Sequence, residues 1–203
     1  MIRESVHAFL ACLVTFALCA VAYPAAVYGV GHTLFPSQAE GSLIRRDGKV
    51  VGSMHIAQPF RSDRYFAPRP SAAGADGYAT DAASGSNLAA TNPALRERIA
   101  ADAARQVAAR AEAVGHAEAD NPVPVDLVTA SGSGLDPDLS PEAARYQAPR
   151  VAKARNLPVE RILERIDARV DRSGAIFGAP PRVNVLLLNL DLDAMPSGSA
   201  ARR

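Results

Sequence analysis

The chain has 203 residues, with 22 Lys and Arg against 21 Asp and Glu, so its formal net charge is +1. This balance excludes a general electrostatic attraction to nucleic acid or to an anionic membrane surface. The length allows one domain plus a small additional element, and a hydrophobic share of 48% excludes a chain that is disordered throughout. Both cysteines, Cys12 and Cys19, lie in one apolar segment, which excludes a disulfide framework and a cysteine metal site.

The apolar segment covers residues 8–31 and follows a short N-terminal tail, residues 1–7. As a helix it would be about 36 Å long, which exceeds the roughly 30 Å hydrocarbon core of a bilayer. We therefore predict one transmembrane helix in the lipid bilayer. The alternative is a cleaved signal peptide, because Arg3 precedes the segment and Ala20-Val21-Ala22 resembles a cleavage site. The apolar run continues to Val30, which favours the retained helix.

Small side chains recur in this segment at alternating steps of four and three residues. On an α-helix that spacing forms one stripe, along which a second helix can approach closely in lipid. Coincidence in an alanine-rich chain is the alternative interpretation. The members of this predicted partner-helix stripe are Ala8, Cys12, Thr15, Cys19, Ala22, Ala26 and Gly29.

A hairpin and a long loop open the following part, residues 32–193. The Asp47-Gly48 pair is a strong turn signal between two short apolar runs, so a β-hairpin is predicted within residues 42–60. Residues 61–93 are rich in Pro, Gly, Ser and Ala and show no usable period, which predicts a long loop. A loop of that length in a compact domain usually carries a function.

Helices and strands follow in the second half of the chain. Asn92-Pro93 and Ser140-Pro141 each combine an N-cap residue with Pro at the first helical position, and a third helical pattern begins at Pro158. The predicted helices are residues 93–114, 140–156 and 158–170, the predicted strands are residues 125–129 and 183–192, and residues 194–203 are a predicted disordered tail. The predicted fold class is α+β, with one N-terminal transmembrane helix followed by a mixed α/β soluble domain.

Several familiar reaction centres fail on spacing. Gly48-Lys49 lacks the upstream glycine of a phosphate-binding loop, and the Ser/Gly run at residues 131–134 does not match a Gly-x-Ser-x-Gly elbow. Asp136 and Asp138 flank Pro137, which is typical of a turn before a helix. The histidines, whose neighbours suggest neither a base nor a metal site, are His7, His32, His55 and His116. We therefore predict no catalytic residue and no metal site.

Two polar stretches leave alternatives open. The run Ser84-Gly85-Ser86-Asn87 can form a backbone nest that binds an anion, which would make the domain a nucleotide-binding module. The loop at residues 126–136 contains Asp126, Ser131 and Asp136, which would serve a membrane-anchored extracytoplasmic enzyme. ATP crosslinking would support the first alternative, and hydrolytic turnover would support the second.

Several motifs follow one another in a fixed order along the chain. They are LFPxQAxGSLI from Leu34, GKVVGS from Gly48, YFxxRPS from Tyr65, SxSNL from Ser84, TNP from Thr91, PxDLVTASGSGLDP from Pro124 and RVNVL from Arg182. In this order they resemble the C subunit of the bacterial Kdp potassium-transporting P-type ATPase, the KdpC family. The resemblance covers the chain from the apolar segment to about residue 193.

The resemblance implies an accessory subunit, without catalysis of its own, in a high-affinity ATP-driven potassium uptake complex of the bacterial inner membrane. The implied partners are a channel-like A subunit, an ATP-hydrolysing B subunit and a small F subunit. The implied topology is a single membrane pass with the domain outside the cytoplasm, beside the potassium entrance of the A subunit. Basic residues on the two sides of the span, taken alone, leave the orientation open.

The same resemblance implies a role as a catalytic chaperone that raises the ATP affinity of the B subunit, with ATP as the implied cofactor. Its candidate contacts are Ser84, Gly85, Ser86, Asn87 and Gln147. The family pattern Ser-Gly-Gly-Ser-Asn-Leu-Gly-Pro is altered here, because one glycine is missing and Ala-Ala replaces Gly-Pro. A domain outside the cytoplasm would also not meet cytoplasmic ATP, so direct binding and the implied topology conflict.

Overall fold

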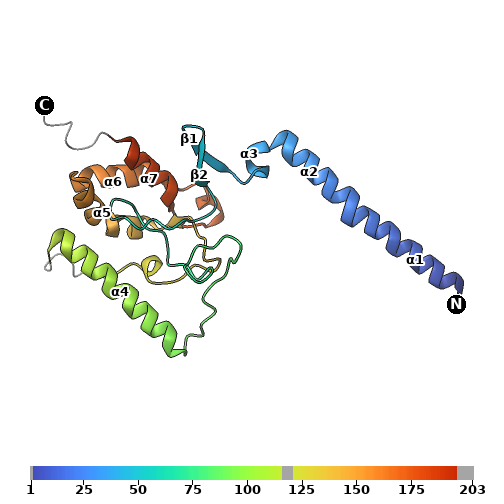
Figure 1. The fold of residues 1–203 in the computed structure, drawn as a ribbon, viewed down its shortest axis with the longest axis horizontal. Coiled ribbons are helices and arrows are strands. Elements are labelled where there is room, and N and C mark those ends of the chain that lie inside the picture. Colours follow the sequence, from blue (N-terminus) through green and yellow to red (C-terminus); the bar gives the residue numbers. More distant parts are fainter. Residues whose placement is uncertain (1, 116–120, 196–203) are drawn as a thin grey trace. The chain divides into compact units, whose positions relative to one another are not determined.

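The computed structural model describes residues 2–115 and 121–195, and the chain divides into two compact units, Met1–Ser53 and Met54–Arg203 (Figure 1). The predicted fold class is confirmed, because an N-terminal apolar helix precedes a unit of mixed helices and small sheets. The unit boundary falls after the hairpin, whereas the predicted domain starts at residue 32. His116 and the predicted tail from residue 196 onward lie outside the described residues.

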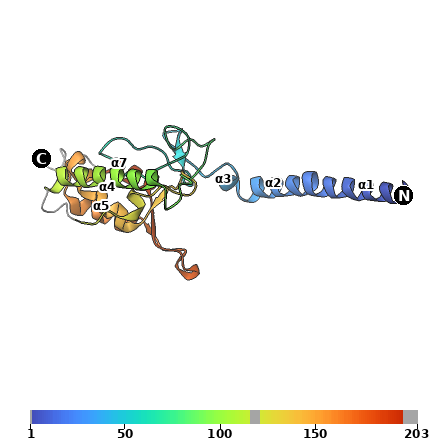
Figure 2. The same ribbon diagram turned by 90° about the horizontal axis from the view of Figure 1, so that it is seen from below.

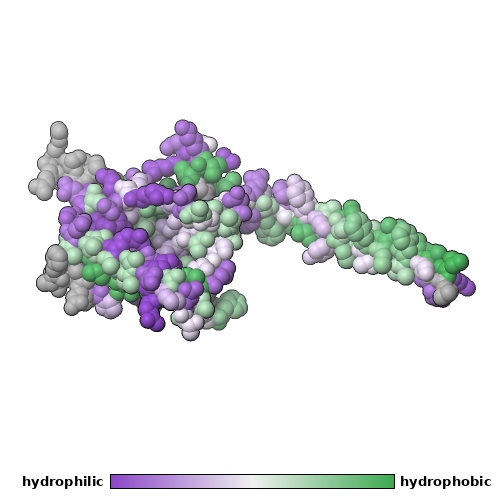
Figure 3. Space-filling view, turned by 60° about the horizontal axis from the view of Figure 1, so that its bottom comes forward, coloured by the Kyte–Doolittle hydropathy of each residue, from purple (hydrophilic) through white to green (hydrophobic). Residues whose placement is uncertain are grey.

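One continuous apolar helix, Ile2–Leu34, makes up most of the first unit. It consists of α1 (Ile2–Phe16), the π-helical segment η1 (Ala17–Ala22) and α2 (Tyr23–Leu34). Its 33 residues give a length of about 50 Å at 1.5 Å per residue. No side chain in its apolar window is buried within the chain, and Figure 3 shows the hydrophobic surface that results. The helix is therefore long and apolar enough to cross a membrane.

The π-helical segment alters the predicted small-residue stripe. The Tyr23 N–H donates to the carbonyl of Leu18, five residues earlier, and Pro24 follows without an N–H to donate. A π-helical turn contains more residues than an α-helical turn, so it rotates everything beyond it around the axis. Cys19 and Ala22 lie within η1 itself. The stripe members before it are therefore offset from Ala26 and Gly29 beyond it, and the partner-helix stripe stays a prediction with two displaced halves.

The predicted hairpin is present in the first unit. A short helix, α3 (Pro36–Ala39), precedes strands β1 (Leu43–Arg46) and β2 (Lys49–Ser53), which pair antiparallel. Asp47 and Gly48 form the turn, and both have positive φ angles, +51° and +76°. Two central residues with positive φ are typical of the tight turn that matches the twist of paired strands.

Helix α5 (Pro141–Arg155) is the centre of the second unit. It packs against α4 (Pro93–Val114) and α6 (Val159–Ala168), and α6 also contacts α7 (Val185–Ala194) (Figure 1). The predicted N-caps are confirmed: the side chain of Asn92 accepts from Ala94 N, and that of Ser140 accepts from Ala143 N. The main core residues are Phe66, Leu127, Leu139, Val151, Ile162, Ile166, Val183, Leu188 and Leu192.

A small antiparallel sheet lies beside this core. Its strand order is β3 (Asp138–Leu139), β5 (Arg182–Asn184) and β4 (Val170–Asp171). The register places Asn184 opposite Asp138 and Arg182 opposite Asp171. Polar side chains from three separate strands therefore come together at this sheet. The loop between β4 and β5 contains one further turn of helix, η4 (Ala175–Phe177).

Two strand predictions are wrong. Residues 125–129 contain the short 3-10 helix η3 (Val125–Leu127), in which Leu127 N donates to Pro124 O, so local turns satisfy the backbone instead of a strand partner. Residues 183–192 hold only the end of β5 and then α7, because Asn184 caps Leu187 N at 3.1 Å and starts a helix. For a short apolar run, periodicity alone does not distinguish a buried strand from a buried helix.

Candidate functional site

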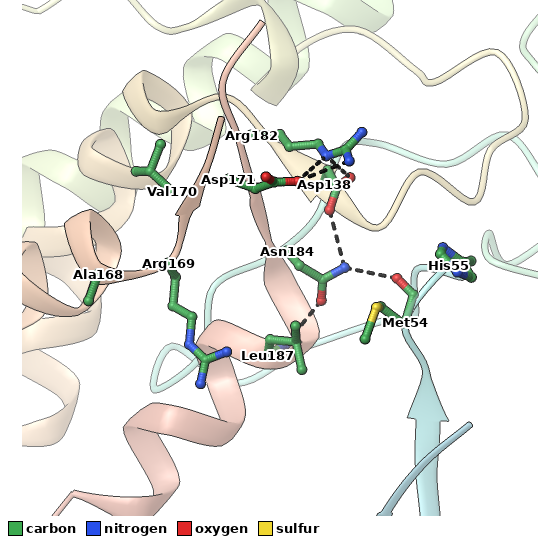
Figure 4. Close-up of a pocket in the computed structure, with 10 residues that line it drawn as sticks. All are labelled: Met54, His55, Asp138, Ala168, Arg169, Val170, Asp171, Arg182, Asn184 and Leu187. Atoms are coloured by element: carbon green, nitrogen blue, oxygen red, sulfur yellow. Dashed lines mark hydrogen bonds and ion pairs between the residues drawn. The ribbon is translucent and has the colours of Figure 1, made fainter. Parts of the chain in front are cut away.

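A pocket of about 490 Å³ lies beside the sheet of the second unit (Figure 4). All three strands contribute to it, together with the chain just after the first unit and the start of α7. The lining residues are Met54, His55, Asp138, Ala168, Arg169, Val170, Asp171, Arg182, Asn184 and Leu187. We call it the sheet pocket.

Two carboxylates share one guanidinium at the sheet pocket. The Nη2 atom of Arg182 lies 3.0 Å from Oδ2 of Asp171, and its Nε lies 3.6 Å from Oδ2 of Asp138. A second guanidinium, that of Arg169, is engaged by both oxygens of Asp191 at 2.5 Å. The group formed by Arg182 and its two carboxylates therefore keeps a surplus negative charge.

Asn184 joins three parts of the chain at the sheet pocket (Figure 4). Its Nδ2 donates to the carbonyl of Met54 at 2.9 Å and to Oδ1 of Asp138 at 3.1 Å, and its Oδ1 accepts from Leu187 N. One amide thus connects Met54, the first residue of the second unit, to the edge strand β3 and to the first turn of α7. This side chain is used by the fold. The carboxylate oxygens of Asp138 and Asp171 also have partners, but each can accept a further hydrogen bond, so a ligand can use them.

The two carboxylates have opposite pKa shifts. Burial raises the pKa of Asp138, although the Asn184 hydrogen bond and Arg182 act in the other direction. The backbone N–H of Ser173, which donates to Asp171 at 2.8 Å, lowers the pKa of Asp171 together with the Ser173 and Arg182 side chains. As pH falls, Asp138 takes up a proton before Asp171. Acidification therefore reduces the negative charge of the pocket at Asp138 first.

The family model for the K+-transporting ATPase c chain, KdpC, matches residues 5–194 of the chain. The chain belongs to the KdpC family. It is 52% identical to the potassium-transporting ATPase KdpC subunit of Myxococcus xanthus, covering 90% of this chain and 83% of the relative. The KdpC subunit of Caulobacter vibrioides (strain NA1000 / CB15N) is 54% identical, over 87% of this chain and 86% of the relative. The KdpC subunit of Mycobacterium tuberculosis (strain ATCC 25177 / H37Ra) is 48% identical, over 96% of this chain and 100% of the relative.

Residues 84–87, the candidate ATP-contacting loop from the KdpC resemblance, pack against the Ser/Gly run at residues 131–134. A Cβ on Gly85 would lie 2.9 Å from the carbonyl of Gly132, and a Cβ on Gly134 would lie 2.6 Å from the carbonyl of Ser84. Ser84 donates its hydroxyl to the carbonyl of Gly85, and Asn87 has a φ of +50°. Residues 84–87 and 131–134 therefore meet backbone to backbone, which the sequence did not predict.

Gln147 lies elsewhere, within the core of the KdpC-family domain. It is 3% exposed, its Oε1 accepts from Ala67 N at 3.0 Å, and its Nε2 donates to Ala67 O at 3.0 Å. Arg150 also donates to this Oε1 at 2.9 Å. The amide that was a candidate ATP contact is therefore occupied by the backbone of its own chain.

A second buried side-chain amide binds the backbone of the neighbouring residue, Phe66, in the same way. Asn189 of α7 is 2% exposed, accepts from Phe66 N at 2.9 Å and donates to Phe66 O at 3.0 Å. Arg155 adds a hydrogen bond to the carbonyl of Arg64 at 2.7 Å. Side chains of α5 and α7 thus take the place of strand partners for residues 64–67, which we call the clamped segment.

The residues of the enzyme alternative also have structural partners. Asp126 accepts from Ser140 N at 2.8 Å, and Asp136 forms an ion pair with Arg69 at 3.0 Å. Asp136 also accepts from Asp138 N, as in the predicted turn, but strand β3 follows directly and helix α5 begins only at Pro141. Ser131 is buried, and its Oγ has no hydrogen-bond partner among the described residues. Within residues 2–115 and 121–195, no group of three or more His, Cys, Asp or Glu is placed to hold a metal.

Proposed function

We propose that this chain is the accessory subunit of an ATP-driven potassium uptake complex in the bacterial inner membrane. Its partners are a channel-like A subunit, an ATP-hydrolysing B subunit and a small F subunit. The observation that carries the proposal is the KdpC family match, which runs from the apolar helix to the end of α7 and so includes both units. The relatives that the chain matches are themselves named potassium-transporting ATPase subunits.

The chain acts in assembly and not in catalysis. Two of the three residues available to an enzyme, Asp126 and Asp136, hold the backbone of Ser140 and the side chain of Arg69, which supports a structural use of these carboxylates. The apolar helix docks the chain among the membrane subunits, where close packing drives helix association. The folded unit Met54–Arg203 lies outside the cytoplasm and shapes the potassium entrance.

The chain raises the ATP affinity of the B subunit through the assembled complex, without holding ATP itself. The occupied amide of Gln147 supports this indirect route, because a nucleotide would have to displace Ala67 to reach it. Direct nucleotide binding at residues 84–87 is the competing route. Photoaffinity labelling of the complex with an azido-ATP analogue separates the two: label on the B subunit alone supports the indirect route, and label on this chain overturns it.

Growth at limiting potassium tests the assembly role. A strain without this chain should fail to grow, and its membranes should lack potassium-stimulated ATPase activity. The full-length chain should restore both. A complex that is assembled and fully active without the chain would refute the proposal.

Labelling of intact cells tests the orientation. A cysteine at the exposed Thr80, in a chain with Cys12→Ala and Cys19→Ala, should react with a membrane-impermeant maleimide added outside. Reaction only after the cells are opened would place the domain in the cytoplasm. In that case direct ATP binding by this chain would again be open.

A further inference from the structure

The loop between β4 and β5 carries the most exposed large hydrophobic side chains in the described part of the chain. Ile176 is 91% exposed and Phe177 is 90% exposed. In Figure 2 the orange-red segment that contains them stands clear of the rest of the second unit. A contiguous exposed apolar site of this kind marks an interaction surface, because burying it is favourable and leaving it in water is not. We call residues 174–179 the apolar tip.

The apolar tip is a built structure. Phe177 N donates to Gly174 O at 3.0 Å, Ala179 N donates to Gly174 O at 3.1 Å, and Gly178 adopts a φ of +77°. A Cβ on Gly174 would lie 2.7 Å from the Cβ of Ala179, so the two ends of the turn are in close contact. Two prolines then follow before β5. The turn therefore presents its two apolar side chains in a fixed arrangement, which reduces the entropy lost on binding.

The base of the loop is anchored to the sheet pocket. Asp171 accepts from Ser173 N at 2.8 Å and pairs with Arg182 across the two strands. Both residues also line the pocket. The apolar tip and the sheet pocket therefore belong to one continuous surface, in which a hydrophobic anchor is followed by a charged patch with a surplus carboxylate.

A bilayer is a poor fit for the apolar tip. Residues 173–181 contain no charged side chain, and of the two arginines that flank them Arg182 is paired with Asp171, so the loop lacks the cluster of basic residues that attracts anionic lipid. Its two side chains offer about 11 carbon atoms, and a myristoyl chain with about 14 gives only marginal membrane binding. A chain that already carries a membrane-spanning helix would gain little from such an anchor.

A second copy of the chain is also a poor fit. Contact between two tips would cover only two large side chains on each side, far below the roughly 1,200–2,000 Å² of a stable protein interface. A pocket on a larger partner is different, because one or two apolar or aromatic anchors at its centre can carry most of the binding energy.

We propose that the apolar tip inserts Ile176 and Phe177 into an uncharged apolar pocket on another subunit of the pump, outside the membrane. The inference rests on the proposed function, since it requires a partner polypeptide. The sheet pocket then faces a basic or hydrogen-bond-donating group of the same partner, next to the anchor. Loss of the anchor leaves the membrane helix as the remaining attachment, so the chain dissociates from the complex faster.

Photo-crosslinking in the full complex tests this insertion. The photoreactive residue p-benzoylphenylalanine at position 177 should crosslink to one pump subunit, and the same residue at the exposed position 125 should not. Crosslinks only to lipid, or only to a second copy of this chain, would overturn the proposal. The absence of any crosslink from position 177 in a complex that co-purifies intact would also overturn it.

A paired substitution supplies the quantitative readout. Ile176→Ser with Phe177→Ser should raise the rate of dissociation of the chain from the detergent-solubilised complex at least tenfold, whereas Val125→Ser, at another exposed hydrophobic position, should leave it unchanged. Because both tip side chains are exposed, the urea unfolding midpoint of the variant should match that of the wild type. If the wild-type chain itself does not co-purify with the pump, the proposed function fails. If it does and the tip variant dissociates equally slowly, only the tip inference fails.

Discussion

Replacement of Asn189 by Leu tests the clamped segment most directly. Asn189 is 2% exposed, and its amide is the partner of both the N–H and the carbonyl of Phe66, a residue that is itself fully buried. Leu has the same branched shape and the same number of non-hydrogen atoms as Asn, so the change removes the hydrogen bonds and leaves no cavity. Each buried backbone group left unsatisfied costs about 1–3 kcal/mol, so we expect a loss of about 2–6 kcal/mol in the free energy of unfolding.

Urea unfolding of the full chain in detergent, followed by far-UV circular dichroism, measures this loss. Gln106→Leu is the matched control, because it makes a similar amide-to-aliphatic change at a half-buried position of α4 and should shift the free energy by less than about 0.5 kcal/mol. Hydrogen exchange adds a local readout: the amide of Phe66 should exchange much faster in the variant. Equal midpoints for Asn189→Leu and the control would refute the clamp.

Asn189→Asp separates the two hydrogen bonds of the clamp. An ionised carboxylate still accepts from Phe66 N but cannot donate to Phe66 O, whereas a protonated carboxyl can do both. We therefore expect the variant to be destabilised at neutral pH and to recover part of the loss as pH falls. A penalty that does not change with pH would show that the bond to the Phe66 carbonyl contributes little.

Four further predictions concern a glycine, two carboxylates and the membrane helix. Gly134→Ala should lower the free energy of unfolding by more than about 1 kcal/mol, because φ is +71° and the added Cβ would lie 2.6 Å from Ser84 O. Gly132→Ala is the control, since its Cβ would have open space, and it should change the free energy little in the same urea assay. Asp138→Asn should raise stability at pH 7 and match the wild type below about pH 3.9, since a raised folded pKa favours folding only at low pH. Asp171→Asn should lower stability at pH 7, and the loss should disappear as pH falls through the lowered pKa of Asp171. Ala22→Leu should weaken the association of the chain with the pump's membrane subunits by about 1–2 kcal/mol, which lowers the amount of chain that co-purifies with them. Unchanged co-purification would refute the stripe.

Local signals predicted the elements whose ends depend on neighbouring residues. The caps at Asn92 and Ser140 start helices at the predicted positions, since the capping bond spans only two or three residues. The Asp47-Gly48 turn is of the same kind, because its two positive φ angles are a property of the turn itself. The helix Ile2–Leu34, long and apolar enough to cross a membrane, likewise follows from composition and length alone.

Long-range contacts decided the elements that were predicted wrongly. The run from residue 183 to residue 192 has the composition of a strand, yet Asn184 caps a helix and Asn189 reaches Phe66, 123 positions earlier in the chain. In a strand, residues 185 and 189 would share one face with 187, whereas in the helix Val185 and Asn189 lie on the buried face and Leu187 does not. The polar residue that looked like an interruption of a buried strand is the contact that holds the helix in place.

The sheet pocket shows the same limit for the candidate site. Asp138, Asp171 and Arg182 lie up to 44 positions apart in the sequence, and only the strand order β3-β5-β4 brings them together. The motif from residue 182 was part of the family resemblance, but no spacing rule connects it to a carboxylate on a two-residue strand. The physical use of each polar group is therefore what separates the candidate sites: the amides of Gln147 and Asn189 are occupied by backbone, whereas Asp138 has a raised pKa and faces an open cavity. A partner that docks beside the apolar tip would reach Asp171 and Arg182 at the base of the loop and Asp138 beyond them, so its complementary group should be a cation or a hydrogen-bond donor.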